Sequence, residues 1–226
     1  MTFKNMLTTV MERLPDRRFR AFWPQIGKNY KKGEGTLFVG QAVGPWGKDW
    51  KDGVWFDDGH HHDVKAIRAY SEEPGGDDTC PLAWFERHLS GSFRPTVRRL
   101  TRGQSDEQGW SSRIAWTNLY KVAPGKRGNP RHALTLVQYD ACRSLLDEEI
   151  HQLQPRRVVV LAGKNWFEPF FPLRGSVIAG LEKDPLKIGM LRSPCIIVLA
   201  PHPSTAHRNR VGLADFCRQI ERASPE

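Results

Sequence analysis

The amino-acid sequence predicts an α/β protein: a single three-layer domain with a central, mainly parallel four-stranded sheet flanked by helices. Short apolar runs that are typical of buried strands alternate along the chain with longer segments of helical periodicity. A length of 226 residues with 39% hydrophobic residues is enough for one sizeable core. We therefore expect one domain over residues 1–226, in which 1–35 form an N-terminal helix and a basic linker and 36–223 form the core.

The first half of the sequence contains one clear helix and one clear strand. Apolar residues recur every three or four positions over 2–14, and Pro15 then ends this helical pattern. After a basic, aromatic linker, the apolar run 36–39 ends at a glycine and predicts a buried strand. Glycines and prolines interrupt the region 40–110, for which we expect irregular structure with a short helix at 81–89.

The second half carries the remaining elements of the sheet and its helices. Strands are predicted at 113–119, 157–162 and 195–200, and helices at 131–152 and 211–223. Because strands alternate with helices, the sheet is expected to be mainly parallel. In such sheets ligands bind at the carboxyl ends of the strands, so the residues that follow each strand are the candidates for chemistry.

The charge balance indicates a polyanionic partner. The chain has 34 lysines and arginines against 25 acidic residues, a net charge of +9, which favours nucleic acid or an anionic membrane surface. No apolar run reaches the roughly 18 residues that a membrane span needs. Residues 1–14 carry polar side chains where a signal peptide would be apolar. We expect a cytoplasmic protein with no membrane span and no obligate protein partner, while the charge alone does not choose between nucleic acid and a membrane surface.

The cysteines and histidines do not form a recognisable metal site. The four cysteines, Cys80, Cys142, Cys195 and Cys217, lie dozens of residues apart without a C-x-x-C pair, which argues against a zinc knuckle or a local disulfide framework. The run 60–62 consists of adjacent histidines, which cannot all face one ion from a regular element. We expect reduced thiols and no metal.

Three predicted strands end in segments that carry chemistry. The first strand runs into Gly-Gln-Ala-Val-Gly at 40–44, and the second ends in Thr-Asn-Leu-Tyr-Lys at 117–121. The last strand runs into Pro-His-Pro-Ser-Thr at 201–205. Because the carboxyl ends of parallel strands meet at one edge of a sheet, we expect these three segments to form one site.

In this order, the three segments resemble the motifs of the uracil-DNA glycosylase superfamily. GQAVG is similar to the first motif, which is GQDPYH in the classical branch and GEAPG in the iron–sulfur branch, and HPST is similar to the HPS motif before the DNA-penetrating loop. Between them, TNLYKVAPGKRGNP resembles the TNVVKCRPP segment of the iron–sulfur branch. The resemblance spans roughly residues 36–210 and implies the fold and the base-excising activity of that superfamily.

The chemistry of base excision gives these residues roles. A glycosylase extrudes a nucleotide, reads the edge of its base, and stabilises negative charge on the departing base. The Asn118 amide is both donor and acceptor, so it can pair with N3 and the position-4 group of a pyrimidine. His202 can donate a hydrogen bond to O2 as charge develops there. The resemblance implies these two catalytic roles, and Gln41 is expected to hold the base or the water.

Further contacts to the base and to DNA follow from the same placement. Trp55 or Phe56 is expected to stack on the flipped base, and Arg208 to fill the gap that it leaves. The candidates for contact with the base are Gly40, Ala42, Gly44, Trp55 and Phe56. The candidates for contact with DNA are Ser204, Thr205, His207, Arg208, Arg210 and Lys121.

The sequence departs from the superfamily pattern at two positions of the first motif. Ala42 replaces the aspartate that positions water in the classical branch, which leaves the water-activating group open among several acidic residues at 49–58. Gly44 stands where the classical motif has a tyrosine that closes the C5 edge of the base. Since glycine has no side chain, the site is expected to admit pyrimidines with C5 substituents.

The iron–sulfur branch also needs four cysteine ligands, two of them near the N-terminus. Only Cys142 falls at a comparable place, and Val122 stands where another ligand is expected. We therefore predict no cluster and no other cofactor.

The sequence favours a monofunctional DNA glycosylase that hydrolyses the N-glycosidic bond of a flipped pyrimidine and leaves an abasic site. The expected substrate is a C5-modified pyrimidine, as in modified phage DNA, which would give the protein a role in defence. Three alternatives remain open: a uracil-DNA glycosylase of base-excision repair, a non-catalytic DNA-binding module, and a nucleotide hydrolase or covalent abasic-site trap acting through His207.

Overall fold

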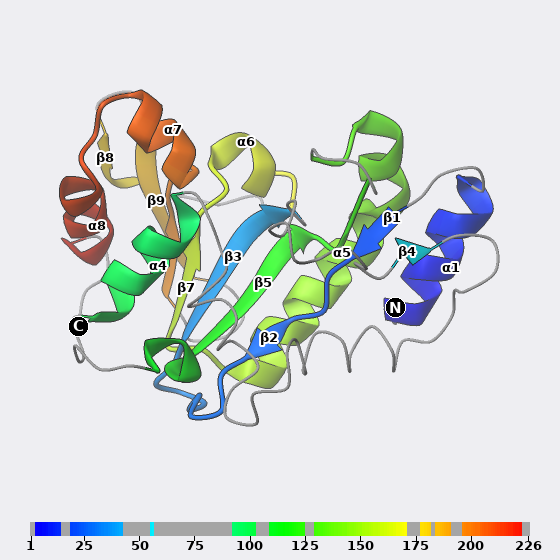
Figure 1. Ribbon diagram of the computed structural model, residues 1–226, viewed down its shortest axis with the longest axis horizontal. Helices are drawn as coiled ribbons and strands as arrows, with labels where there is room; N and C mark the ends of the chain where they lie inside the picture. Colours follow the sequence, from blue (N-terminus) through cyan, green and yellow to red (C-terminus); the bar gives the residue numbers. More distant parts are fainter. Residues whose placement is uncertain are drawn as a thin grey trace.

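A seven-stranded sheet organises the protein, for which a computed structural model describes most of the chain (Figure 1). The described residues are 3–14, 19–42, 55–56, 92–102, 109–124, 129–170, 177–181, 184–190 and 196–222. The strand order is β2-β5-β3-β7-β10-β9-β8. These strands are β2 (Gln25–Ile26), β3 (Thr36–Ala42), β5 (Ile114–Tyr120), β7 (Arg157–Val160), β8 (Val177–Leu181), β9 (Asp184–Met190) and β10 (Ile196–Leu199).

The four central strands, β5, β3, β7 and β10, run parallel to one another. They are the four strands that the sequence predicts, so the expectation of a mainly parallel sheet in an α/β fold is confirmed. Strands β2, β9 and β8 pair antiparallel at the two sides and extend the sheet beyond the prediction. β2 is too short for a periodic signal, and Gly180 and Pro185, which face each other across β8 and β9, are residue types that are rare in strands.

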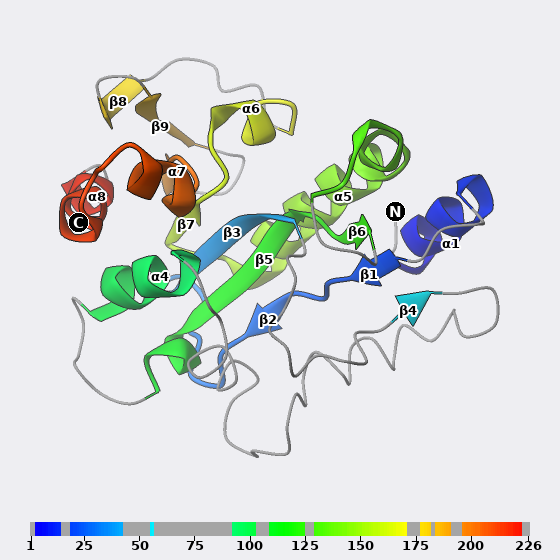
Figure 2. The same cartoon turned by 45° about the horizontal axis from the view of Figure 1, so that its top comes forward.

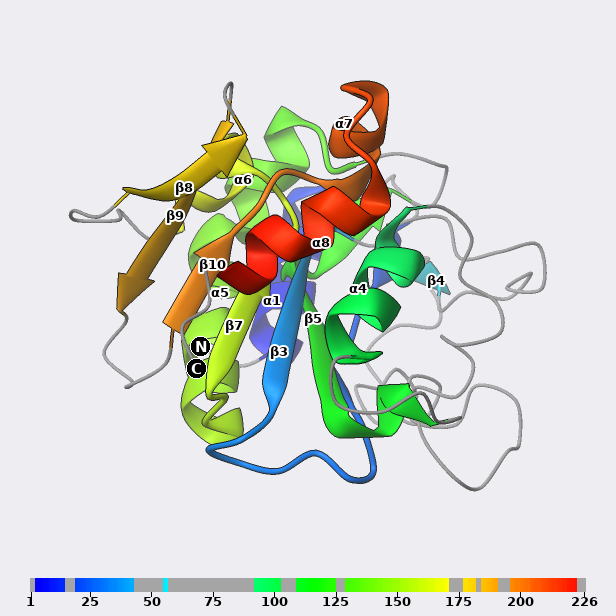
Figure 3. The same cartoon turned by 90° about the vertical axis from the view of Figure 1, so that its left-hand side faces the viewer.

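Helices cover both faces of the sheet and complete the three layers (Figure 3). Helices α1 (Phe3–Arg13) and α5 (His132–Leu153) lie on one face, and α4 (Phe93–Arg102) and α8 (Leu213–Arg222) lie on the other. The short helix α7 (Pro203–Arg208) packs beside α4 and α8, and α6 (Lys164–Phe167) follows β7. The described helices include none that is both long and apolar enough to cross a membrane.

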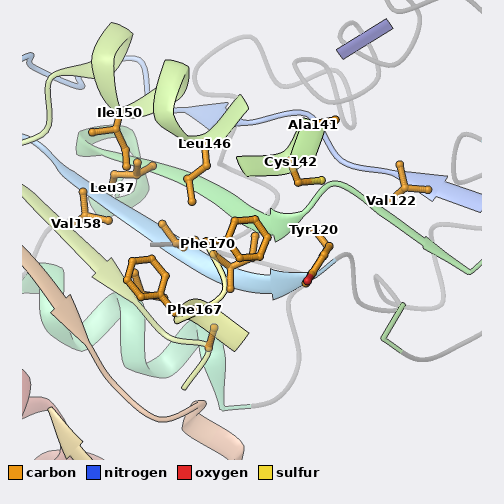
Figure 4. Close-up of a cluster of buried hydrophobic side chains, with 14 of the residues drawn as sticks. Leu37, Tyr120, Val122, Ala141, Cys142, Leu146, Ile150, Val158, Phe167 and Phe170 are labelled. Carbon is orange, nitrogen blue, oxygen red and sulfur yellow. The ribbon is translucent and has the colours of Figure 1, made fainter. Parts of the chain in front are cut away.

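Alternate residues of the central strands supply the two cores. On β3, Leu37 and Val39 pack toward α5 and α1, whereas Phe38 packs toward α4 and α8. All three side chains are fully buried. Such strands read as continuous apolar runs because both of their faces are covered. Figure 4 shows the first core, where Leu146 and Ile150 of α5 lie over Leu37 and Val158.

A second, three-stranded sheet lies beside the first (Figure 2). It contains β4 (Trp55–Phe56), β1 (Phe19–Ala21) and β6 (Val122–Pro124), all paired antiparallel around β1. β6 follows directly on β5, so the two sheets share one continuous stretch of chain. The segment expected to be a linker therefore contributes β1 and β2.

Helix α4 corrects the expectation of irregular structure up to residue 110. Phe93, Val97 and Leu100 form an apolar stripe at steps of four and three residues, but four arginines surround it in a ten-residue segment. Pro95 lies in the first turn, where a helix tolerates proline. The helix expected at 81–89 lies outside the described residues. The other three predicted helices begin and end within two residues of their expected bounds.

Two leucines on α5 give a matched test of this packing. Leu146 is fully buried and Leu136 is 62% exposed. We expect Leu146→Ala to lower the free energy of unfolding by about 2–5 kcal/mol, because it removes buried methyl groups and leaves a cavity. Leu136→Ala is expected to change it by less than about 0.5 kcal/mol. Urea denaturation measures both, and equal effects would contradict the burial pattern.

Candidate functional site

The carboxyl ends of β5, β3, β7 and β10 lie in register at one edge of the sheet. Gly40 on β3 pairs with Asn118 on β5. Beyond β7, the Leu161 amide donates to the Val39 carbonyl at 2.9 Å, and the Ala200 amide donates to the Val160 carbonyl at 2.9 Å. The three segments that follow the strands are thus brought to one edge, as the sequence predicts.

Gly163 ties the exit of β7 to the exit of β10. Its φ of 81° lies in the left-handed region that favours glycine. Its amide donates to the Ala200 carbonyl at 2.9 Å, and a Cβ at this position would lie 3.9 Å from the backbone nitrogen of His202. The conformation of Gly163 therefore helps to set where the chain turns toward His202.

The Asn118 side chain lies over Gly40. It is 1% exposed, and its Oδ1 occupies the space that a Cβ of residue 40 would need. That Cβ would also lie 3.6 Å from Cε2 of Phe93, whose ring packs against Trp116 with centroids 5.7 Å apart. The missing side chain of Gly40 is what allows the carboxamide to sit at this strand end.

The side-chain nitrogen of Asn118, Nδ2, is a buried donor for which no described residue provides an acceptor. A buried donor without an acceptor costs about 1–3 kcal/mol. A buried polar group without a partner calls for an explanation, and a ligand that supplies the missing acceptor is one. Asn118 is therefore the residue of this edge that is best placed to read a bound polar ring.

Gln41 joins the exits of β3 and β7. Its Nε2 donates to the Ala162 carbonyl at 3.0 Å, and its Oε1 accepts from Nδ2 of Asn129 at 3.4 Å. Counting only the described residues, one amide hydrogen and one lone pair of Gln41 remain for a bound molecule. Asn129 was not singled out from the sequence. It lies within the segment that resembles the superfamily, but its spacing gave no signal of its own.

His202 follows β10 and is half-buried. Its Nδ1 accepts a hydrogen bond from the Ser204 amide at 3.2 Å and lies 2.6 Å from the Ser204 hydroxyl. A ring nitrogen that accepts from a backbone amide carries no hydrogen, so the proton of the neutral ring is on Nε2. Burial lowers the pKa of His202, and the nearby Arg208 lowers it further. The ring is therefore a neutral donor through Nε2.

Lys121 is not available for contact with DNA, which corrects the sequence-based expectation. The side chain is fully buried, and its ammonium donates to Thr117 Oγ1, the Asn118 carbonyl and Glu149. A lysine that follows a strand is usually a surface residue. Here Glu149, on α5, supplies a counter-charge from 28 positions away, which no local pattern reveals.

The other candidates from the last motif lie around α7. Ser204 and Thr205 are half-buried in the first turn, where the Thr205 amide donates to the His202 carbonyl at 2.8 Å. Arg208 and Arg210 are exposed, and Nε of Arg208 donates to the Ser204 carbonyl at 3.3 Å. His207 lies in α7, and its side chain is outside what the structure describes.

Of the remaining candidates, the structure describes Ala42 and the backbone of Trp55 and Phe56. The backbone of Trp55 and Phe56 forms β4 in the smaller sheet, beside β1, and the structure does not describe these two side chains. Ala42 is half-buried and packs against the core under α5. Gly44 and the acidic residues at 49, 52, 57 and 58 lie outside the described residues.

The described histidines, cysteines and acids contain no cluster of three or more that could hold a metal ion. Cys142 and Cys217 are both free and buried, but they belong to the cores on opposite faces of the sheet. These two thiols therefore cannot bind the same ion. Cys80 and Cys195 lie outside the described residues.

Comparison with known proteins agrees with this geometry. The family model of the Uracil DNA glycosylase superfamily matches residues 29–223. A search of curated proteins found no match.

The protonation of His202 can be tested directly. We expect a pKa below 6.5 and the Nε2-protonated form of the neutral ring, because burial and Arg208 disfavour the cation. The unfolded chain then binds the proton more readily, so stability falls as the pH drops below 6.5 and through the pKa of the folded state. Nitrogen-15 NMR of the imidazole during a pH titration measures both the pKa and which ring nitrogen carries the proton.

Arg208→Gln is the control for this titration, and it should raise the pKa of His202 because it removes a nearby positive charge. A pKa at or above 6.5 in the unsubstituted protein, or a proton on Nδ1, would contradict the assignment.

The contact between Gly40 and Asn118 predicts a position-specific effect of adding one methyl group. Gly40→Ala should displace the Asn118 carboxamide and lower the free energy of unfolding by about 1–3 kcal/mol through overpacking. Gly212→Ala is the control, because its Cβ would lie 3.5 Å from Oδ2 of Asp215, an ordinary contact distance. Denaturant unfolding and the NMR shifts of the Asn118 side-chain amide check this, and a stable Gly40→Ala with unchanged shifts would refute it.

Proposed function

Because the chain belongs to the Uracil DNA glycosylase superfamily and is a DNA glycosylase, an N-glycosidic bond hydrolase, we propose that it excises a C5-modified pyrimidine. The enzyme flips the nucleotide out of the DNA, cleaves the bond between base and sugar, and leaves an abasic site. The reaction is monofunctional, since we assign no lysine as the nucleophile of a Schiff base.

The unsatisfied amide of Asn118 is the observation that carries this proposal. Its Nδ2 is buried without an acceptor among the described residues, at the strand end beside Gly40. A uracil-type ring offers a carbonyl at position 4 to this donor and an N3 hydrogen to Oδ1. With the amide rotated, the same pair of groups reads the edge of cytosine. The binding of a pyrimidine would therefore satisfy a donor that the protein leaves unpaired.

His202 supports the bond-breaking step. As the glycosidic bond lengthens, negative charge develops on the base, and a donor aimed at O2 stabilises it. The neutral ring with its proton on Nε2 provides that donor, because Ser204 holds Nδ1 from the other side. A hydrogen bond prepared in this way needs no reorganisation during the reaction.

The amides of Gln41 and Asn129 are our candidates for holding the attacking water. Ala42 offers no carboxylate, whereas Gln41 is fixed to the Ala162 carbonyl and has one hydrogen and one lone pair that no described residue uses. An amide cannot remove a proton at neutral pH, so its role is to position the water.

Gly44 supports the choice of a C5-modified substrate. It stands where the classical motif has a tyrosine, so no side chain of this residue blocks the C5 edge. Phage DNA in which modified pyrimidines replace the ordinary ones would supply such a substrate, and we propose defence in the cytoplasm as the biological role. Excision of uracil in DNA repair is the second candidate, because Asn118 and His202 read uracil equally well.

A panel of oligonucleotides tests the proposal. Single- and double-stranded DNA would carry uracil, a thymine mispair, 5-hydroxymethyluracil, 5-hydroxymethylcytosine or its glucosylated form, and alkali would reveal the abasic sites. We expect cleavage at the C5-modified bases. Cleavage of uracil alone would assign the protein to repair, and no cleavage of any substrate would contradict the proposed activity.

Two histidine variants control this panel. His202→Ala should lower the excision rate by about 100-fold or more, as loss of an oxyanion-type donor does, with little change in DNA affinity. His151→Ala removes an exposed histidine near the end of α5 and should leave the rate unchanged. A covalent adduct that survives SDS would instead indicate an abasic-site trap at His207.

A further inference from the structure

A buried ion pair lies on the face of β5 opposite to the Asn118 side chain. Nζ of Lys121 is 2.8 Å from Oε2 of Glu149, and their side chains are 0% and 13% exposed. Thr117 belongs to the same cluster, since its hydroxyl lies 2.5 Å from Nζ. The pair thus joins the end of β5, the strand that carries Asn118, to the C-terminal part of α5.

The ammonium of Lys121 has three hydrogens and three acceptors. It donates to Thr117 Oγ1 at 2.5 Å, to the Asn118 carbonyl at 2.8 Å and to Glu149 Oε2 at 2.8 Å. The backbone of Lys121 is fixed as well, because its carbonyl accepts from the Phe22 amide at 2.8 Å. The cation therefore has one defined position, and one of its three bonds goes to Asn118.

This cluster is an expensive way to hold a protein together. A buried ion pair loses the hydration of both ions, and hydrophobic replacements of similar size are often as stable or more stable. Burial raises the pKa of Glu149, while Lys121 and the Thr117 hydroxyl oppose that shift. Stability alone does not account for charges at this place.

Asn118 needs support from its backbone. No described residue accepts from its Nδ2, so the carboxamide is oriented by its contact with Gly40 and by the direction of its own Cα–Cβ bond. The Lys121 ammonium fixes the peptide plane that follows Asn118 by binding its carbonyl. Gly40 thus contacts the side chain of Asn118, and the ion pair holds its backbone carbonyl from the opposite face of β5.

We propose that Lys121 and Glu149 are positioning residues for Asn118, holding its carboxamide in the direction that the base edge requires. This inference rests on the proposed role of Asn118 in reading the base. It assigns the lysine of the TNLYK segment a function inside the protein, not at the DNA surface. A displacement of the Asn118 side-chain amide should reduce the stabilisation of the transition state more than it reduces the affinity for DNA.

A double substitution separates positioning from stability. Lys121→Met and Glu149→Met should each destabilise the fold, because each leaves a buried charge without its partner. Together they should restore the melting temperature to near that of the unsubstituted protein. The kcat of the double variant should still be about tenfold lower than that of the unsubstituted protein. Its KM for the DNA should change by less than about twofold. A double variant with full stability and an unchanged kcat would overturn the proposal.

An exposed ion pair provides the matched control. Lys164 is the first residue of α6 and Glu168 directly follows the helix; Nζ of Lys164 lies 3.4 Å from Oε1 of Glu168, and both side chains are substantially exposed. Lys164→Met with Glu168→Met should leave kcat, KM and the melting temperature nearly unchanged, because surface pairs contribute little. If the double variant at 121 and 149 does not fold, Thr117→Val removes one acceptor without changing charge and should lower kcat by about threefold, whereas an unchanged kcat would count against positioning.

An NMR measurement decides the question without a known substrate. The side-chain amide of Asn118 should give one sharp pair of signals in the unsubstituted protein and shifted or broadened signals in the double variant or in Thr117→Val. Unchanged signals would refute the positioning role. If the unsubstituted protein cleaves none of the oligonucleotides, the proposed function fails, while these spectra still test whether Lys121 and Glu149 orient Asn118.

Discussion

The alignment of β3 with β5 is the constraint on which the site depends. Parallel pairing places Gly40 directly opposite Asn118, and only a residue without a Cβ leaves room for the carboxamide there. The same parallel hydrogen bonding continues through β7 to β10 and sets the exit toward His202. A shift of one residue between β3 and β5 would put a larger side chain against Asn118 and exchange the two faces of the strand.

The two faces of β5 carry different groups, with the Asn118 side chain on one face and the ion pair of Lys121 and Glu149 on the other. Asn118 faces the layer of α4, whereas the neighbouring Thr117 faces the ion pair that Glu149 supplies from α5. Successive side chains of a strand point to opposite faces, so two adjacent residues serve different layers. The strand therefore lies between the Asn118 carboxamide and the ion pair that we propose to position it.

Much of the fold and part of the site could be predicted from the sequence. The four central strands are apolar on both faces, and three of them run into motifs at one edge, so their positions and the meeting of the Asn118 and His202 segments at that edge could be predicted. The burial of Lys121 was not, because it depends on a carboxylate that only tertiary packing brings near. Asn129 and α4 were missed for similar reasons, since a lone amide and an arginine-rich helix carry weak local signals.

The N-terminal helix lies outside the family match and inside the hydrophobic core. The match begins at residue 29, yet Met6, Leu7 and Val10 of α1 are buried in the same cluster as Leu146 of α5. Phe22, also before the match, binds the backbone of Lys121. A chain trimmed to the family boundary would therefore expose apolar surface on α5 and remove the Phe22 amide that binds the Lys121 carbonyl. In this protein, the region that matches the family model is therefore shorter than the unit that folds.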